Sequence, residues 1–234
     1  MQKIKVVSVS AGDGVNSLLW KNRSFFNKNT DFAEVEINLH HYNKNSLASI
    51  YNQYITEEYK DYIVVFVHDD VFISDGNFCE KCVKAVELFD VFGVAGGTGA
   101  VEIPVNTPAL WHLMCNKKVG YAGHYKSNEI KNDNPFTTCW MTSFGYTPFP
   151  ATLVDGVFFG INVGKVLNTV RFDEHCPSRF HFYDLLFCIN AKRAGLRVGV
   201  FPFNIFHQSP GLQSYSDEFN NGDLYFKNYC NTLI

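Results

Sequence analysis

The feature that most constrains the fold is an alternation of apolar runs with segments of helical periodicity over the first hundred residues. The predicted strands lie in residues 3–14 (with a glycine loop), 33–42, 61–70 and 91–103, and the predicted helices cover 46–59 and 77–90. This order is typical of a parallel sheet covered by helices. Ligands of such sheets bind beyond the carboxyl ends of the strands, so functional residues are expected there.

The second half of the chain is less regular. Residues 102–150 are rich in Asn, Thr, Gly, Pro and aromatic residues and show little helical or strand periodicity. This predicts a long connecting segment that is functional or partly ordered. A strand with a glycine turn is predicted over 151–167, a helix over 179–195 that ends at Gly195, and a last strand over 196–211. We therefore expect one α/β domain with a mostly parallel sheet flanked by helices.

Composition excludes several function classes. The 234 residues suit one domain, and the net charge of −3, without a long run of Lys or Arg, argues against sequence-independent nucleic-acid binding. No stretch approaches the roughly 18 apolar residues of a membrane span. The seven cysteines follow no disulfide pattern, and the N-terminus is too short and strand-like for a signal peptide. Reduced thiols and a cytoplasmic location are therefore expected.

The strongest predicted strand ends on two carboxylates and an imidazole, His68-Asp69-Asp70. Successive strand residues point to opposite faces, so His68 and Asp70 can share one side while Asp69 turns away. Carboxylates at a buried strand end need compensation, which Mg²⁺ or Mn²⁺ can supply. An Asp can equally satisfy backbone N–H groups at a turn. The triplet alone leaves a metal site and a capped turn equally open.

Three further positions can carry chemistry, and each has a simpler explanation. Asp155-Gly156 forms either a plain turn or the rim of a polar ligand site. Asp184 lies at a predicted helix start. Its negative charge either interacts favourably with the positive end of the helix dipole or serves as a general base. His207, at the end of the last strand, is a hydrogen-bonded core residue more often than a ligand, although it can complete a metal site.

The motif "CEKC" is a weaker candidate. Cys79 and Cys82 would need two further ligands, for example His112 and Cys115, to hold zinc. The pair falls within a helical period, with Cys82 on the apolar face, and it does not open a helix after a strand. A zinc site and a thioredoxin-like redox site are both disfavoured.

Taken in order, these motifs resemble those of nucleotide-sugar glycosyltransferases of the GT-A fold, family 2 type, and look most like the streptomycin-biosynthesis glycosyltransferase-like subgroup. "VFVHDDV" resembles the family's strand that ends in Asp-x-Asp, with His68 at the first acidic position and Asp70 at the metal-binding last one. "FYDLLFCINAKRAG" resembles the helix that supplies the base. In the family this acid precedes the helix-ending Gly by eleven positions, and 195 − 184 = 11 selects Asp184. Tyr183 stands where the family has Glu.

The resemblance implies a metal-dependent inverting glycosyltransferase with a Rossmann-like GT-A domain. Residues 1–100 would be the nucleotide-binding half and residues 101–234 the acceptor-side half. Asp184 would be the base, and Asp70 and His207 would hold Mn²⁺ or Mg²⁺ against the diphosphate of a nucleoside-diphosphate sugar, most commonly a UDP-sugar. The expected donor contacts are Ser8, Ser10, Ala11, Asn52, His68 and Asp69. The expected acceptor contacts, on a glycan or another hydroxyl compound, are Asp155, Gly156, His181 and Trp140.

Two other functions remain open at this point. A sugar nucleotidyltransferase shares a similar sheet but usually has a Gly-rich phosphate loop with a basic residue, whereas "SAGDGVNS" is followed by no Lys or Arg before Lys21. A non-catalytic nucleotide- or glycan-binding domain is suggested by the departures at His68 and Tyr183. Pyrophosphate release would favour the first alternative, and metal-independent binding without turnover would favour the second.

Overall fold

The computed structural model describes residues 1–26, 33–125, 139–208 and 215–232. In this part of the chain the main sheet has seven strands, in the spatial order β2 (Ala33–His40), β1 (Gln2–Val9), β3 (Tyr62–Val67), β11 (Phe158–Asn162), β5 (Val91–Gly93), β12 (Val198–Val200) and β9 (Phe149–Pro150). All of these strands except β11 and β9 run in one direction. The expected α/β fold is therefore confirmed, but the main sheet is mixed, because β11 and β9 pair antiparallel to their neighbours.

A second sheet adjoins the first. Its strands are, in order, β10 (Leu153–Val154), β6 (Ala95–Val101), β7 (Cys115–Tyr125), β13 (Ile205–His207) and β4 (Val71–Ile73), with β8 (Cys139–Ser143) paired to β7. The chain passes from the main sheet into this second sheet directly after β3, through the turn at residues 68–70. That turn therefore lies at the junction of the two sheets.

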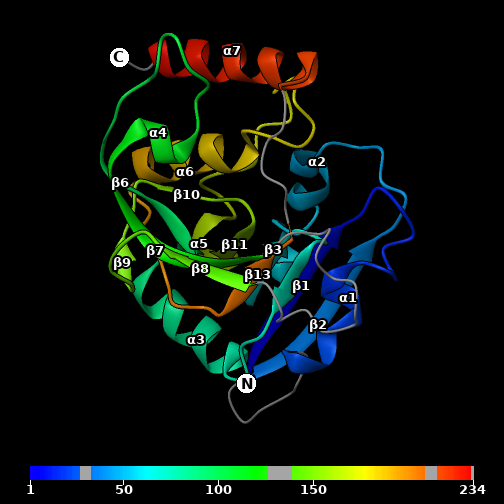
Figure 1. Ribbon diagram of the computed structural model, residues 1–234. Helices are drawn as coiled ribbons and strands as arrows, with labels where there is room; N and C mark the ends of the chain where they lie inside the picture. Colours follow the sequence, from blue (N-terminus) through cyan, green and yellow to red (C-terminus); the bar gives the residue numbers. More distant parts are fainter. Residues whose placement is uncertain (27–32, 126–138, 209–214, 233–234) are drawn as a thin grey trace.

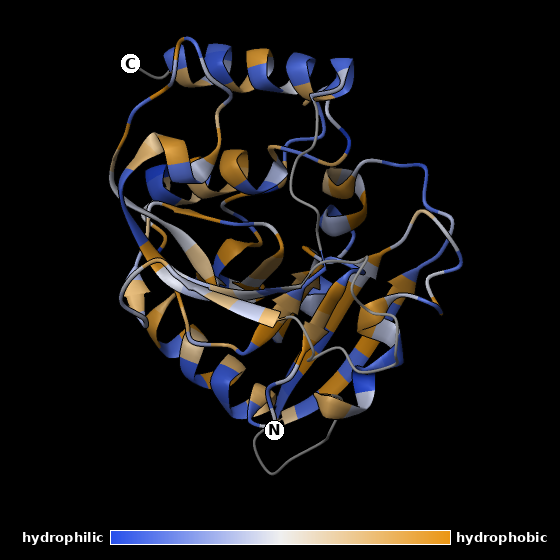
Figure 2. Ribbon diagram, viewed as in Figure 1, coloured by the Kyte–Doolittle hydropathy of each residue, from blue (hydrophilic) through white to orange (hydrophobic). Residues whose placement is uncertain are grey.

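The helices cover the strands on both sides, as Figure 1 shows, with α3 below them, α6 above them and α7 outside α6. The helices are α1 (Leu18–Lys21), α2 (Leu47–Asn52), α3 (Phe78–Leu88), α4 (Trp111–Met114), α5 (Val163–Val166), α6 (Tyr183–Arg193) and α7 (Asp217–Asn231), with short 3₁₀ turns at Arg23–Phe25 and Glu57–Tyr59. Figure 2 shows the central strands as largely hydrophobic, whereas hydrophobic and hydrophilic residues alternate along the outer helices. Accordingly, Ile63–Val67 of β3 are at most 1% exposed.

Local signals explain several helix ends. Ser46 caps α2, its hydroxyl accepting a hydrogen bond from Ser49 N at 3.2 Å, as predicted. The helix stops at Asn52, however, and the rest of the predicted 46–59 segment contains only a 3₁₀ turn. Gly195 has φ of +81° and follows α6, which confirms it as the helix stop. Helix α7 was not predicted, although Ser216 caps it and acidic residues fill its first turn.

The predicted last strand, residues 196–211, is wrong as a single element. It divides into β12 in the main sheet and β13 in the second sheet. Pro202 lies between them, and because proline has no backbone N–H it cannot continue a central ladder. A tight turn from Phe203 N to Phe201 O, 2.9 Å long, redirects the chain. This break carries His207 to the second sheet, opposite Val71.

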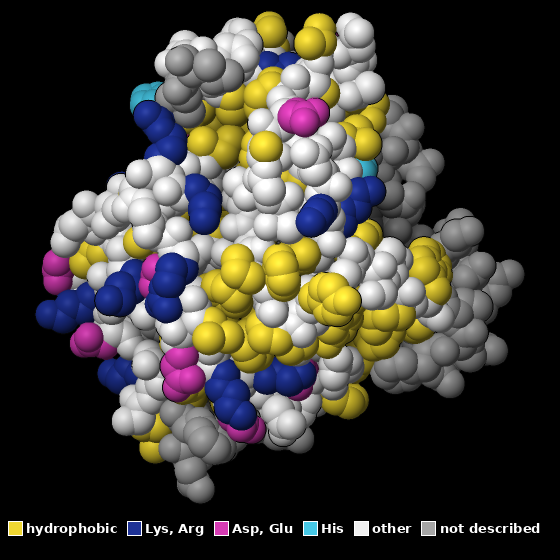
Figure 3. Space-filling model, turned by 90° about the vertical axis from the view of Figure 1, so that its left-hand side faces the viewer, with side chains coloured by type: hydrophobic (Ala, Val, Ile, Leu, Met, Phe, Trp, Pro, Cys, Tyr) yellow, Lys and Arg dark blue, Asp and Glu magenta, His cyan; other side chains and the backbone are white. Residues whose placement is uncertain are grey.

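Within residues 102–150, the part that the structure describes is more ordered than its sequence suggests. It contains α4, β7, β8 and β9, and β7 is the longest strand of the second sheet. Figure 3 shows one face of the molecule, on which hydrophobic side chains gather in the middle and Lys and Arg side chains are interspersed with acidic ones. On this face the described residues form no continuous basic surface of the kind that binds nucleic-acid backbones.

The close approach of β11 to Phe92 gives a test of the packing. Gly160 lies between β3 and β5, and a Cβ added there would overlap the fully buried Phe92 ring. We expect Gly160→Ala to lower the free energy of unfolding by about 1–3 kcal/mol through overpacking, measured by urea denaturation. Gly76→Ala is the control, because a Cβ there meets nothing within 4 Å. Equal stability of the two variants would contradict this packing.

Candidate active site

A cleft of about 690 Å³ lies where the carboxyl ends of β3 and β13 meet the amino end of α6. It is the place at which ligands of open α/β sheets bind. The side chains that line it are mostly aromatic, acidic or imidazole groups. They include His68, Asp70, Trp111, His112, Lys118, His124, Thr142, Phe144, Asp155, Phe180, His181, Tyr183, Asp184 and His207.

One wall of the cleft is a cluster of His68, Asp70 and His207. Each side chain offers one ligand atom, and these atoms lie within 4.8 Å of one another. The main chain fixes the cluster: Gln208 N donates to Asp70 O at 2.8 Å, and His68 N donates to Val157 O at 3.2 Å. As expected, His68 and Asp70 face the cleft together, while Asp69 does not line it.

The charges within this cluster compensate one another. His207 Nε2 lies 3.2 Å from Asp70 Oδ1. Burial would lower the pKa of His207 and raise that of Asp70, but their mutual attraction outweighs burial, so the pKa of His207 is raised and that of Asp70 is lowered. His68 faces less compensation, and its burial lowers its pKa, which favours the neutral imidazole.

The cluster has the donors that a divalent cation requires. Asp70 Oδ1 is buried and makes no well-formed hydrogen bond, although His207 Nε2 lies 3.2 Å away. An unsatisfied buried carboxylate oxygen is costly, and a cation would satisfy it. A carboxylate with two imidazoles is also a chemically suitable donor set. Among the residues that the structure describes, this is the one group of its kind.

Beside this cluster the cleft holds two neighbouring carboxylates. Asp184 Oδ2 accepts from Gly156 N at 2.8 Å, and Asp155 Oδ2 accepts from the Trp111 indole N–H at 2.6 Å. Burial, and next the negative charge of Asp155, raise the pKa of Asp184 to about 7, although backbone hydrogen bonds oppose the shift. A carboxyl group with this pKa is suited to general acid–base chemistry near neutrality.

Tyr183 connects the His68, Asp70 and His207 cluster to the turn at Asp155-Gly156. Its hydroxyl donates to Gly156 O at 3.0 Å and lies 3.1 Å from His68 Nε2. A Cβ on Gly156 would overlap that hydroxyl, so only glycine fits there. The two positions at which the sequence departs from the family motif, His68 and Tyr183, are therefore in direct contact.

The preceding residue, Phe182, has an unusual backbone conformation. Its φ is +67°, in the left-handed region that non-glycine residues rarely adopt. The ring is buried against Phe219 and Phe226 of α7, with centroids 5.0 and 5.9 Å away. Packing by α7 thus stabilises the turn that points Tyr183 and Asp184 into the cleft.

The structure brings some predicted site residues together. The cleft contains His68, Asp70, Asp155, Gly156, His181, Asp184 and His207. Their roles remain predictions, but their convergence from distant parts of the sequence is now established.

Other predicted residues lie outside this cleft. Ser8 and Ser10 are buried at the end of β1, Ala11 is exposed in the next loop, and Asp69 O accepts from Leu19 N. Trp140 is exposed on β8 and stacks on His124, a cleft residue. A donor role for these four residues and an acceptor role for Trp140 remain predictions.

The structure does not support the expected nucleotide contact at Asn52. The side chain is buried, and its amide nitrogen donates to Phe172 O at 2.9 Å and to Glu174 Oε1 at 2.7 Å. Its amide oxygen accepts from Phe172 N at 2.9 Å. Because these bonds use both amide hydrogens, Asn52 fixes the segment before α6 rather than a ligand.

The cysteines show no sign of a metal or redox site in the described structure. All seven are free thiols, and Cys79 and Cys82 are buried on α3. No group of potential metal ligands among the described residues includes them.

Sequence reasoning missed the cleft residues of the irregular 102–150 segment. Trp111, His112, Lys118 and His124 line the cleft, and Trp111 binds Asp155 directly. The unusual length of the segment was the available signal. Its lack of periodicity hid which residues would face the site.

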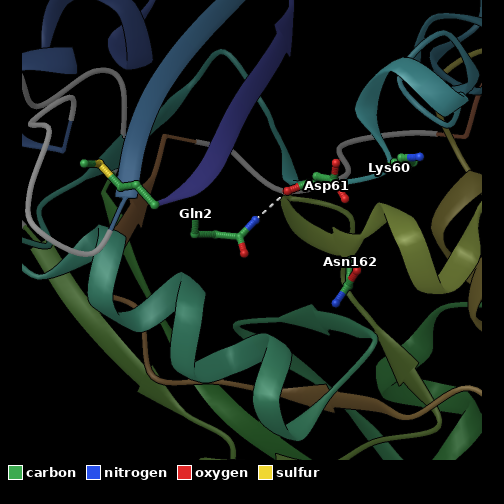
Figure 4. A pocket seen from close by; sticks show the side chains of 5 residues that line it. Gln2, Lys60, Asp61 and Asn162 are labelled. Carbon is green, nitrogen blue, oxygen red and sulfur yellow. Dashed lines mark hydrogen bonds between the residues drawn. The ribbon is translucent and has the colours of Figure 1, made fainter.

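A smaller pocket at the opposite edge of the main sheet lacks such chemistry. Figure 4 shows Gln2, Lys60, Asp61 and Asn162 around it, with Gln2 Nε2 donating to Asp61 O at 2.7 Å. It lies at the amino ends of β1 and β3, away from the cleft. We therefore assign the chemistry to the cleft.

Comparisons with known proteins identify the family and the fold. Residues 30–228 match the model of a glycosyltransferase-like family. Among solved structures, S. aureus TarS 1–349 in complex with UDP-GlcNAc has a TM-score of 0.50 and 12% identity, over 94% of this chain and 63% of that one. A197 from STIV has a TM-score of 0.44 and 15% identity, over 89% of this chain and 86% of that one. No curated protein sequence matches the chain.

The mixed sheet with its flanking helices has the GT-A fold. Because the family model spans most of its length, the chain belongs to the glycosyltransferase-like family. In the described residues, no helix has both the length and the apolar character needed to span a bilayer.

The proximity of the two carboxylates predicts a shift that can be measured. Asp155→Asn removes the negative charge that contributes to the raised pKa of Asp184. We expect the pKa of Asp184 to fall from about 7 towards, but not to, its ordinary value, because burial remains the larger cause. Carboxyl ¹³C NMR titration would measure this shift. An unchanged pKa in Asp155→Asn would contradict the coupling.

Proposed function

We propose that the protein is a metal-dependent inverting glycosyltransferase that moves a sugar from a nucleoside-diphosphate sugar to a hydroxyl acceptor. The observation that carries the proposal is Asp184, with a pKa near neutrality, in the same cleft as a cluster suited to a cation. Family membership supports transfer of a sugar. We infer a UDP-sugar donor, since the structure of TarS used for comparison contains UDP-GlcNAc.

In the proposed reaction, Asp184 accepts the proton of the acceptor hydroxyl. The deprotonated oxygen then attacks the anomeric carbon directly, which inverts its configuration. Gly156 N and Leu185 N each donate to one oxygen of Asp184, so the carboxylate is held in a fixed orientation. Asp155, itself held by Trp111 and by Val157 N, and His181 offer polar contacts for the acceptor.

Asp70 and His207 would hold Mn²⁺ or Mg²⁺. When bound, such an ion neutralises negative charge on the departing diphosphate. Residues 1–100 would form the donor half and residues 101–234 the acceptor half, with Trp140 at the outer edge of the latter. We also propose that the protein is cytoplasmic and belongs to the streptomycin-biosynthesis glycosyltransferase-like subgroup.

Replacing the base tests this assignment. Asp184→Asn should abolish sugar transfer from a panel of nucleotide sugars, while calorimetry should still detect donor binding. In the parent, the rate should rise as pH increases through about 7, because the base must be deprotonated. Asp61→Asn is the matched control, since Asp61 is exposed and remote from the cleft. Transfer by Asp184→Asn at the parent rate would exclude Asp184 as the base.

Removal of the cation tests the proposed metal-binding role of Asp70 and His207. Treatment with EDTA should abolish transfer, and added Mn²⁺ should restore it in the parent protein. Asp70→Ala should remain inactive at Mn²⁺ concentrations that saturate the parent, because its carboxylate is the charged ligand. Full activity of the parent in EDTA would show that the reaction proceeds without a metal.

A further inference from the structure

The cation cluster contains an imidazole that the proposed function does not require as a ligand. His68 offers a ligand atom within 4.8 Å of those of Asp70 and His207. The centroids of the His68 and His207 rings lie 5.8 Å apart, and the ring planes meet at an angle of 67°. His68 is anchored at the end of β3 and His207 at the end of β13, which gives each ring a rigid base.

Hydrogen bonding determines which nitrogen of His68 is available. The Tyr183 hydroxyl donates its proton to Gly156 O at 3.0 Å, because a carbonyl can only accept. At 3.1 Å its oxygen therefore accepts from His68 Nε2–H. A neutral imidazole has one N–H, so the lone pair is left on Nδ1. Metal-bound histidines are typically held in this way, by donation from the nitrogen that does not bind the metal.

We propose that His68 is a third protein ligand positioned by Tyr183, and that two imidazoles with one carboxylate select a borderline ion such as Co²⁺ or Zn²⁺ over Mg²⁺. This inference rests on the cation site of the proposed function. Mg²⁺ prefers oxygen ligands, and a second imidazole replaces one of them here. Imidazole suits Zn²⁺ and neighbouring transition metals, whose affinities for such sites exceed that of Mn²⁺.

The proposal assigns Tyr183 a positioning role rather than a catalytic one. Its ring is buried, and its hydroxyl reaches the acceptor-side turn at Gly156 as well as His68. Removing the hydroxyl leaves the ring packing intact, but the proton of the neutral His68 ring is then no longer held on Nε2. Changes of such supporting groups typically cost about 10–100-fold in metal affinity.

Metal titration of the purified protein tests the proposal without a sugar substrate. We expect calorimetry to show tighter binding of Co²⁺ than of Mg²⁺. Tyr183→Phe should weaken Co²⁺ binding about 10–100-fold, and His68→Ala should weaken it at least as much and alter the visible Co²⁺ absorption bands. The preference for Co²⁺ over Mg²⁺ should fall in both variants. His175→Gln, which removes an exposed imidazole, is the control.

A measurement on the parent protein avoids any effect of mutation on folding. With ¹⁵N-labelled histidine, addition of Zn²⁺ should shift the Nδ1 resonance of His68 and leave Nε2 protonated. An unmoved His68 resonance, parent-like Co²⁺ binding by His68→Ala, or equal affinity for Mg²⁺ and Co²⁺ would overturn the proposal. Metal binding that depends on His68 in a protein that transfers no sugar would instead overturn the proposed reaction alone.

Discussion

The antiparallel pairing of β11 with β3 is the contact on which the site depends. A strand that runs against the others has its amino end at their carboxyl edge. Phe158 pairs with Val67, and the ladder continues outward as His68 N donates to Val157 O. The Asp155-Gly156 turn, which precedes β11, therefore lies beside the end of β3. A parallel β11 would place that turn at the opposite edge of the sheet.

This arrangement brings the carboxylates of Asp155 and Asp184 into the same cleft as the cluster of His68, Asp70 and His207. Asp155 and Asp184 repel each other, and the repulsion is tolerated because indole and backbone N–H groups neutralise part of it. Burial, and after it the remaining repulsion, raise the pKa of Asp184. On the cluster side, Asp70 and His207 stabilise each other's charged forms. These electrostatics support the proposed roles, with proton transfer at Asp184 and charge neutralisation at the His68, Asp70 and His207 cluster.

The sequence predicted those parts of the fold and site that depend on local patterns. The buried run of β3, the Ser46 cap and the Gly195 stop each follow from short-range physics, and the spacing to Gly195 selected an aspartate that does line the cleft. Contacts between distant segments could not be predicted in this way. The bonds of Asn52 to Phe172 and of Trp111 to Asp155 join residues far apart in the chain, and no periodicity reports them.

The departures from the family motif are explained by one of these distant contacts. An acid at position 68 would add negative charge beside Asp70, and another at position 183 would stand next to Asp184. Histidine and tyrosine remove both charges and replace them with a neutral hydrogen bond. The same tyrosine also donates to the Gly156 carbonyl and directly precedes Asp184, so it joins His68 to the segment that carries Asp184. Two substitutions that seem to weaken the motif when taken separately therefore form one structural unit that connects the His68, Asp70 and His207 cluster to Asp184, the proposed base.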